Sequence, residues 1–340
     1  MKKYFWLILV SLFFITGCGK FTKDDAIKNF KKQVENSKSY KLNGVMEISN
    51  GEEIFTYSLE TNFLKDDYYK VVLVNQTNNH EQVILKNNDG LYVVTPNLNK
   101  SFKFDSTWPD NSSQSYLLNN LLTDIKDDNE SSFEEKDNNY IIKCKVNYPN
   151  NEDLKYEKIY FDKKMNLEKV EVFDKNDIVK IKVTVKGINL KARLDEDDFK
   201  LEDLVDEVVE DNSCIDDECD DKTGSLDSII YPLYIPVNTH LVNSEGVDLE
   251  KGDRVILTFG GEKNFVIVEE VAKPSDEIEI IPVFGEPLLF NDSIGAMSPN
   301  SISWSNDNIS YYLVGNDLTP SELVSIASSL GNTKTVISQK

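Results

Sequence analysis

Apolar and polar residues alternate along most of the chain between residues 40 and 188, which predicts β-strands with one buried face. Phe55, Tyr57, Leu59 and Phe63 are separated by mostly polar residues, and a period of two places them on the same side of a strand. Turn residues such as Asn87-Asn88-Asp89-Gly90 interrupt the pattern, so we expect an antiparallel meander. Its predicted strands are 40–49, 55–63, 68–74, 82–86, 91–95, 140–148, 155–162, 167–173 and 178–188.

Two stretches show helical spacing instead. Ile27, Phe30 and Val34 repeat every three or four residues within 22–36, and a similar apolar stripe runs through 112–127. A sheet with one apolar face must cover that face, and only these two helices are available for it. The expected fold is therefore α+β, with a curved antiparallel sheet that forms a half-barrel under a helical lid. The interior is either an open apolar cavity or a fully packed core.

The chain after residue 229 returns to short strands and ends in a helix. Two apolar runs flank Gly260-Gly261, which predicts a β-hairpin. Thr319-Pro320-Ser321-Glu322 combines a threonine N-cap, a proline at the first helical position and a glutamate at the third, the pattern of a capping box. We therefore expect a smaller C-terminal α+β domain over 229–331, followed by a tail at 332–340.

The first residues have the pattern of a secretory signal. Lys2 and Lys3 precede an apolar run that is too short to span a bilayer as a helix. The run ends in Ile15-Thr16-Gly17-Cys18, which resembles the bacterial lipobox. That resemblance implies that residues 1–17 are removed and that Cys18 carries a lipid anchor. We therefore expect a protein on the extracytoplasmic side of the cell membrane; the alternative is an ordinary secreted protein.

Acidic residues outnumber basic ones, and their surplus is concentrated in one segment. Without Lys2 and Lys3 the chain has 35 basic and 59 acidic residues, a formal charge of −24. Such a charge repels phosphate backbones, so a nucleic-acid partner is not expected. Sixteen acidic residues and two lysines lie between Asp195 and Ser228. Like charges keep a segment extended, so we place an acidic linker at 201–228, after a first domain at 18–200.

The residues do not form a recognisable catalytic or metal-binding pattern. His80 and His240 lie in different predicted domains and belong to no metal-ligand or nucleophile motif. The glycines do not form a phosphate-binding loop, and carboxylates are too abundant for any one pair to be informative. We therefore predict a protein that is not an enzyme and has no cofactor and no metal site.

Three cysteines besides Cys18 allow different interpretations. Cys144 shares its strand face with Ile142 and is expected to be a small buried residue. Cys214 and Cys219 flank four residues of the acidic segment. In an extracytoplasmic compartment they could form a small disulfide loop, but two free thiols and a weak metal site remain alternatives.

One group of aromatic residues is a candidate binding surface. Phe102, Phe104, Trp108 and Tyr116 lie close together in the sequence. They either pack in the core under the lid or line the rim of a cavity or partner surface, where aromatic rings provide a large apolar contact.

Two stretches carry a resemblance to known proteins. The residues 95–104 (TPNLNKSFKF), Trp108-Pro109 and 113–117 (SQSYL) resemble sporulation and germination lipoproteins of Gram-positive spore formers, typified by GerS. The N-terminal half of that family is similar to LolA and RseB-type proteins, which implies a half-barrel with a helical lid. The pattern from Trp304 to Leu330 resembles a small α+β domain found at the C-terminus of many Gram-positive extracytoplasmic proteins.

These resemblances imply a membrane-anchored binding or scaffold protein of sporulation or germination. The partner implied by the family is a cell-wall (spore cortex) amidase. The alternative, implied by LolA, is a carrier or sensor that takes a lipid or lipoprotein acyl chain into the half-barrel. In a third interpretation, the acidic segment is a spacer that lifts the second domain from the membrane.

Overall fold

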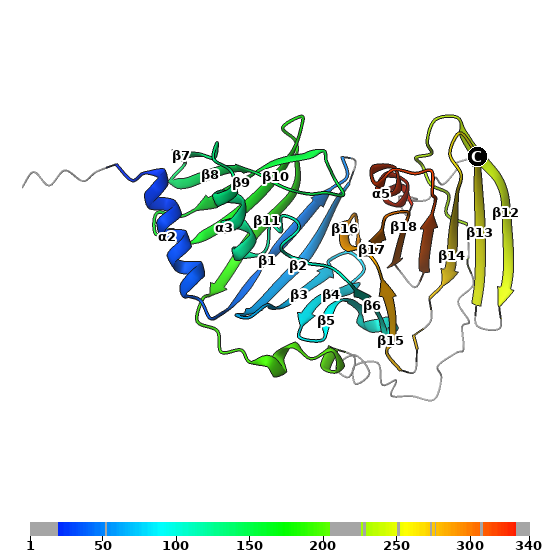
Figure 1. Ribbon diagram of the computed structural model, residues 1–340, viewed down its shortest axis with the longest axis horizontal. Helices are drawn as coiled ribbons and strands as arrows, with labels where there is room; N and C mark the ends of the chain where they lie inside the picture. Colours follow the sequence, from blue (N-terminus) through cyan, green and yellow to red (C-terminus); the bar gives the residue numbers. More distant parts are fainter. Residues whose placement is uncertain are drawn as a thin grey trace, which may run out of the picture.

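The computed structural model describes residues 20–51, 53–204, 226, 229–249, 252–272, 274–275, 277–306 and 309–330. These residues form an α+β fold of two sheets, which lie side by side with short helices against them (Figure 1). The predicted lipidation site Cys18, the pair Cys214 and Cys219, and the tail 332–340 lie outside the described residues. In the described part of the chain, no helix is long and apolar enough to cross a membrane.

The first sheet has twelve strands in the order β15-β6-β5-β4-β3-β2-β1-β11-β10-β9-β8-β7. All neighbouring strands are antiparallel except β15 and β6, and the nine strands predicted in this region are present. The strands are β1 (Ser39–Ser49), β2 (Ile54–Leu64), β3 (Tyr68–Asn75), β4 (Glu81–Asn87), β5 (Gly90–Thr95), β6 (Lys100–Phe104), β7 (Ser132–Lys136), β8 (Asn139–Lys145), β9 (Leu154–Phe161), β10 (Leu167–Asp174), β11 (Val179–Asn189) and β15 (Glu279–Val283).

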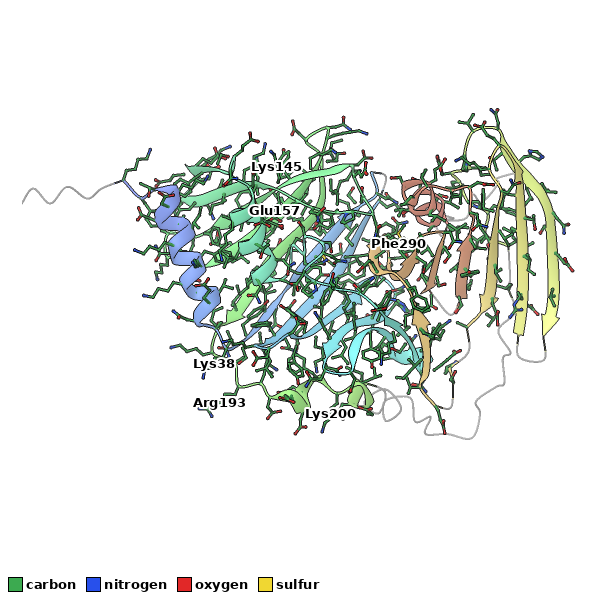
Figure 2. The ribbon with its side chains drawn as sticks, in the orientation of Figure 1. Lys38, Lys145, Glu157, Arg193, Lys200 and Phe290 are labelled. Atoms are coloured by element: carbon green, nitrogen blue, oxygen red, sulfur yellow. The ribbon has the colours of Figure 1, made fainter. Side chains whose placement is uncertain are left out.

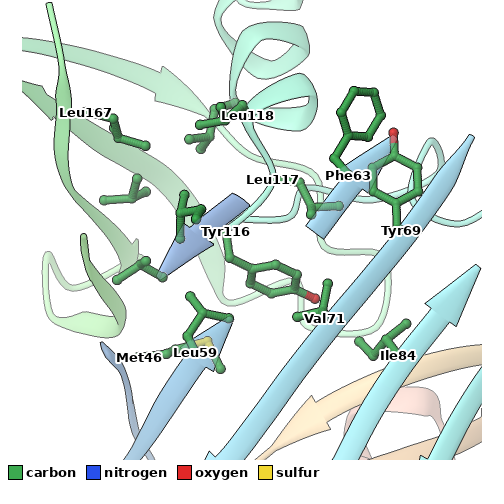
Figure 3. Packing of buried hydrophobic residues seen from close by; sticks show 14 of the residues in the cluster. Met46, Leu59, Phe63, Tyr69, Val71, Ile84, Tyr116, Leu117, Leu118 and Leu167 are labelled. Carbon is green, nitrogen blue, oxygen red and sulfur yellow. The ribbon is translucent and has the colours of Figure 1, made fainter. Parts of the chain in front are cut away.

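Two helices cover one face of this sheet, as the sequence pattern predicts. Helix α2 (Lys23–Asn36) begins with a capping box between Thr22 and Asp25, and it packs beside α3 (Leu118–Asp127). The first core contains residues of both helices and of the sheet. Figure 3 shows Leu118 of α3 among residues of the sheet. A one-sided apolar sheet thus buries its face against an amphipathic pair of helices.

Helix α3 begins later than the sequence predicts. Its first residue is Leu118, not Ser112 or Ser113. The Ser113 hydroxyl does not cap a helix because it donates to Asp124 Oδ1 over 2.9 Å and accepts from the Asn147 backbone N–H over 2.8 Å. These bonds keep the preceding segment in an irregular conformation against the end of β8.

A smaller core lies on the opposite face of β3, β4 and β5. The 3-10 helix η3 (Glu196–Phe199) and the residues after it place Phe199, Leu201 and Leu204 over that face. The linker predicted at 201–228 therefore begins with a packed turn, because its first leucines are buried. Of the rest of that segment, only Leu226 is described, and it packs against the second sheet.

The second sheet has seven antiparallel strands in the order β12-β13-β14-β19-β18-β17-β16. Helix α5 (Pro320–Ser329) packs on one face of it, and the predicted capping box between Thr319 and Glu322 is confirmed. The strands are β12 (Thr239–Leu249), β13 (Gly252–Gly261), β14 (Phe265–Val271), β16 (Glu286–Phe290), β17 (Ser293–Ser298), β18 (Ser301–Asn306) and β19 (Ile309–Val314).

The segment 279–298 joins the two sheets. Strand β15 pairs with β6 in the first sheet, although it follows β14 of the second sheet in the chain. The β16–β17 hairpin then places Ile294 and Ala296 in the first core. The two parts of the chain therefore share a sheet edge and a core.

Candidate functional site

A cavity of about 850 Å³ lies where the two parts of the chain meet. Its first wall is the interior of the first sheet, which contributes Ile48, Ile84 and Ile181. Strand β16 and helix α5 form the opposite wall, and residues of the segments 108–116 and 148–154 complete the lining. Cavities that bind small ligands have volumes of roughly 300–1,000 Å³. The structure thus contains a cavity of ligand-binding size at the interface of the two sheets.

The hairpin wall is fixed to the first sheet by hydrogen bonds in the interior. The Gln82 side chain accepts from Ile294 N–H over 2.6 Å and donates to the Ile294 carbonyl over 3.1 Å. The Tyr57 hydroxyl donates to the Asn291 carbonyl over 2.5 Å, and the Asn291 amide donates to the Ser328 carbonyl of α5. Phe290 at the end of β16 lies between the sheets (Figure 2). These contacts hold the hairpin and α5 in place around the cavity.

All four predicted rim aromatics are buried in the first core, with 1–5% of their surface accessible, and they separate into two pairs. Trp108 and Tyr116 line the cavity, and the Trp108 ring packs edge-on against Tyr69 with centroids 5.7 Å apart. Phe102 and Phe104 do not line it; they are two residues apart on β6, so both point into the first core. Their closeness in sequence did not predict this separation, which depends on where β6 ends.

A network of polar side chains orders the segment 108–116 of the cavity lining. The Tyr116 hydroxyl donates to Gln114 Oε1 over 2.6 Å, and Gln114 Nε2 donates to the Ser112 hydroxyl over 2.8 Å. The Asn120 amide of α3 donates to the carbonyls of Pro109 and Ser112. Sequence analysis did not select these residues, since amide and hydroxyl side chains have no motif of their own.

Two carboxyl groups lie close together in the first part of the chain without lining the cavity: Glu157 is fully buried and Asp124 is partly buried. Burial raises the pKa of Glu157 on β9 well above its ordinary value, and the nearby Asp124 adds to the effect. Burial also raises the pKa of Asp124 to about 7, although the Ser113 hydrogen bond opposes the change. Neither carboxyl group has an ion-pair partner among the described residues. The uncharged form of each carboxyl group is therefore favoured relative to an exposed carboxyl group.

Cys144 is a buried free thiol, as the sequence analysis predicts. Its Sγ donates to Glu157 Oε1 over 3.6 Å, and burial raises the pKa of the thiol. A thiol in such a place is a poor nucleophile because the thiolate is disfavoured. Within the described ranges, no group of three or more His, Cys, Asp or Glu residues is arranged to hold a metal ion.

Comparison with solved structures gives matches of low similarity. The complex of MucA and MucB from Pseudomonas aeruginosa contains a chain that is 10% identical, with 90% of this chain and 98% of that chain covered and a TM-score of 0.33. The structure of the CwlD amidase from Clostridioides difficile in complex with the GerS lipoprotein gives 19% identity, coverage of 48% and 94%, and a TM-score of 0.30. A LolA superfamily protein from Nitrosomonas europaea gives 8% identity, coverage of 53% and 98%, and a TM-score of 0.32.

Comparison of sequences gives a closer relationship. The family model of YdcC-like sporulation proteins matches residues 2–199. The sporulation protein YdcC of Bacillus subtilis (strain 168) is 33% identical over 335 residues, which cover 97% of each chain. Both matches confirm the expected relationship to sporulation proteins of spore formers. The chain therefore belongs to the family of YdcC-like sporulation proteins.

Proposed function

We propose that this chain is a non-catalytic binding protein of sporulation that holds a protein partner at the extracytoplasmic face of the cell membrane. The partner class we propose is a cell-wall amidase, which is the class that the sequence resemblance implies. Membership in a sporulation family supports the process. The observation that carries the binding role is an exposed apolar surface on the second part of the chain.

This surface, which we call the 229–242 surface, is concentrated in one segment. Seven of the twelve large apolar side chains that are exposed in the described residues lie there. Their most exposed members are Leu233, Val237 and Val242, with 66%, 81% and 62% of their surface accessible. Exposed apolar and aromatic side chains of this density are typical of surfaces that bind another protein. The full set is Ile229, Tyr231, Leu233, Tyr234, Val237, Leu241 and Val242.

The segment is held in an ordered position. Pro232 and Pro236 are buried, and the Leu233 N–H donates to the Ser329 carbonyl at the end of α5 over 3.4 Å. Its apolar side chains are therefore presented by a fixed backbone, which lowers the entropy lost on binding. A partner that covers this surface would also lie beside the cavity, since Leu233 and Tyr234 border it.

The test is complex formation between a cell-wall amidase of sporulating cells and the chain from Lys20 onward, which contains every described residue. Leu233→Asp and Val237→Asp are each expected to weaken the complex roughly tenfold, because a charge replaces an apolar contact. Ile178→Asp is the matched control, since Ile178 is 51% exposed in a turn of the first sheet. The proposal would be rejected if the parent chain, both surface variants and the control bound the amidase with equal affinity. It would also be rejected if the parent chain formed no complex with an amidase.

We further propose that Cys18 carries the lipid anchor. The first described residues support a short connection to the protein body, because the Phe21 ring stacks on Tyr140 of β8 with centroids 4.4 Å apart. Two acyl chains bind a membrane stably, whereas one is marginal. Cys18→Ser is expected to abolish labelling by radioactive palmitate and to release the chain from the membrane fraction. A variant that stays labelled and membrane-bound would show that the anchor lies elsewhere.

The lining of the cavity does not favour the alternative role as an acyl-chain carrier. Asn111, Gln114 and several serines border the cavity together with the apolar residues. An acyl chain cannot form hydrogen bonds, and each buried polar group left unpaired costs about 1–3 kcal/mol. The cavity is large enough for an acyl chain, but its polar lining favours a ligand that forms hydrogen bonds.

A further inference from the structure

The polar groups that face the cavity are mainly neutral. They are amides of the two bordering segments, such as Asn111, Gln114 and Asn150, and hydroxyls of α5. Ser321, Ser325 and Ser328 are spaced by four and three residues, so they lie on the face of α5 that borders the cavity. Amide and hydroxyl side chains both donate and accept hydrogen bonds, which suits a ligand with the same neutral groups.

Some of this hydrogen-bonding capacity is unused within the protein. Asn111 Oδ1 is buried and has no partner among the described residues. Gln114 Nε2 makes one hydrogen bond, to Ser112, so its second N–H remains for a ligand. Buried polar groups are rarely left unpaired. The Gln114 amide is therefore a donor available to a ligand in the cavity, whereas Asn111 Oδ1 is unpaired but covered by protein.

Aromatic rings lie beside these polar groups. Trp108, Tyr116, Tyr148 and Tyr234 all border the cavity. Tyr148 is half-buried and Tyr234 exposed, so these two present the most accessible rings, whereas Trp108 and Tyr116 form the floor. An aromatic face carries partial negative charge and contacts aliphatic C–H groups favourably. A wall that alternates rings with amides and hydroxyls complements a ligand with C–H faces and polar edges.

The charges around the cavity disfavour anions. Glu152, Asp153 and Glu286 border it, against one cation, Lys180. Asp153 is paired with Lys175 over 2.8 Å, and Glu286 accepts from the Ser106 hydroxyl. The whole chain has a formal charge of −22. Phosphorylated ligands are therefore repelled, and a neutral ligand is favoured.

We propose that the cavity is a binding site for a neutral, N-acetylated oligosaccharide. Sugar rings present C–H faces to the aromatic residues and hydroxyl edges to the α5 serines, and the carbonyl of an acetamido group accepts from the Gln114 amide. This site adjoins the 229–242 surface, because Leu233 and Tyr234 belong to both. It does not depend on a protein partner, so one proposal can fail while the other holds.

The experiment is a calorimetric titration of the chain from Lys20 onward with the N-acetylglucosamine trimer. Tryptophan fluorescence is a second readout, because Trp108 borders the cavity whereas Trp304 lies in the second core. Gln114→Leu and Ser325→Val are each expected to weaken binding roughly fivefold to tenfold, since each removes one hydrogen-bonding group. Gln76→Leu is the control, as Gln76 lies on the exposed surface and its amide contacts Ser58.

Saturable binding that both cavity variants weaken while they remain folded, and that Gln76→Leu leaves unchanged, supports the site. Gln114→Leu also removes the acceptor of the buried Tyr116 hydroxyl, so its thermal unfolding temperature is expected to fall. Gln114→Leu and Ser325→Val change different walls of the cavity, so a folding defect in one leaves the other informative. Absence of trimer binding to the parent chain overturns the proposal. Binding that neither folded cavity variant weakens also overturns it, as does tight binding of palmitate that excludes the trimer.

Discussion

At the scale of single residues, Glu157 is the least ordinary side chain in the structure. It is fully buried on β9 (Figure 2), and its Oε2 has no hydrogen-bond partner among the described residues. Its contacts are the Cys144 thiol and the nearby Asp124, neither of which is a cation. A carboxyl group in such a place is more stable with its proton than without it.

This burial makes stability depend on pH. The pKa of Glu157 is raised in the folded state, so between the ordinary and the raised pKa the folded chain binds more protons than the unfolded chain, and stability falls as pH rises. Glu157→Gln removes the ionisable group. We expect it to raise the free energy of unfolding by about 1–3 kcal/mol at pH 8, and to give no gain at pH 4, as measured by urea denaturation.

Glu171 on β10 provides the control of opposite sign. Burial raises its pKa, but hydrogen bonds from Lys169 and Tyr160 outweigh that effect and lower the pKa overall. Its charged form is therefore favoured in the folded state, and Glu171→Gln should destabilise the chain at pH 8 more than at pH 4. If Glu157→Gln and the parent chain gave parallel stability curves from pH 4 to 8, our assignment of the protonated state would be wrong.

At the scale of elements, the β16–β17 hairpin joins the two halves of the chain. Gln82 of β4 bonds both the N–H and the carbonyl of Ile294, and both residues are buried. Gln82→Leu keeps the size of the side chain but leaves two buried backbone groups unpaired. We expect it to lower the free energy of unfolding by about 2–4 kcal/mol in urea denaturation, whereas Gln76→Leu on the surface should change it by less than about 0.5 kcal/mol. An unchanged midpoint for Gln82→Leu would show that the hairpin is held by packing alone.

The sequence predicts most elements with a clear apolar period, whereas β6, β7, β12 and β15 were not predicted. The nine alternating strands of the first sheet, both lid helices and the capped α5 are present. Strand β7 was missed because most of its residues are exposed, and the described side chains of β12 are largely exposed as well. Neither strand has a buried face to produce alternation. Strand β15 contains Pro282 and pairs in parallel at an edge, a place where proline is tolerated but gives no strand signal.

At the scale of the whole molecule, the candidate site depends on contacts between distant parts of the sequence. Trp108 and Ser325 border the same cavity although more than two hundred residues separate them. No local pattern places α5 opposite the aromatic segment, so the sequence indicates the candidate rings but not the serines that face them. The fold class follows from short-range periodicity, whereas the cavity follows from how the second sheet docks.

The parallel pairing of β15 with β6 has a consequence for folding during synthesis. Glu279 aligns with Lys100, so β6 has no neighbour on its outer side until the chain has been made beyond residue 283. An unpaired strand edge can pair with another chain, and contacts of long sequence separation form slowly. Newly made chains should therefore pass through an aggregation-prone stage that ends when β15 arrives. Any substitution that delays this step would lower the yield of folded protein more than its effect on equilibrium stability suggests.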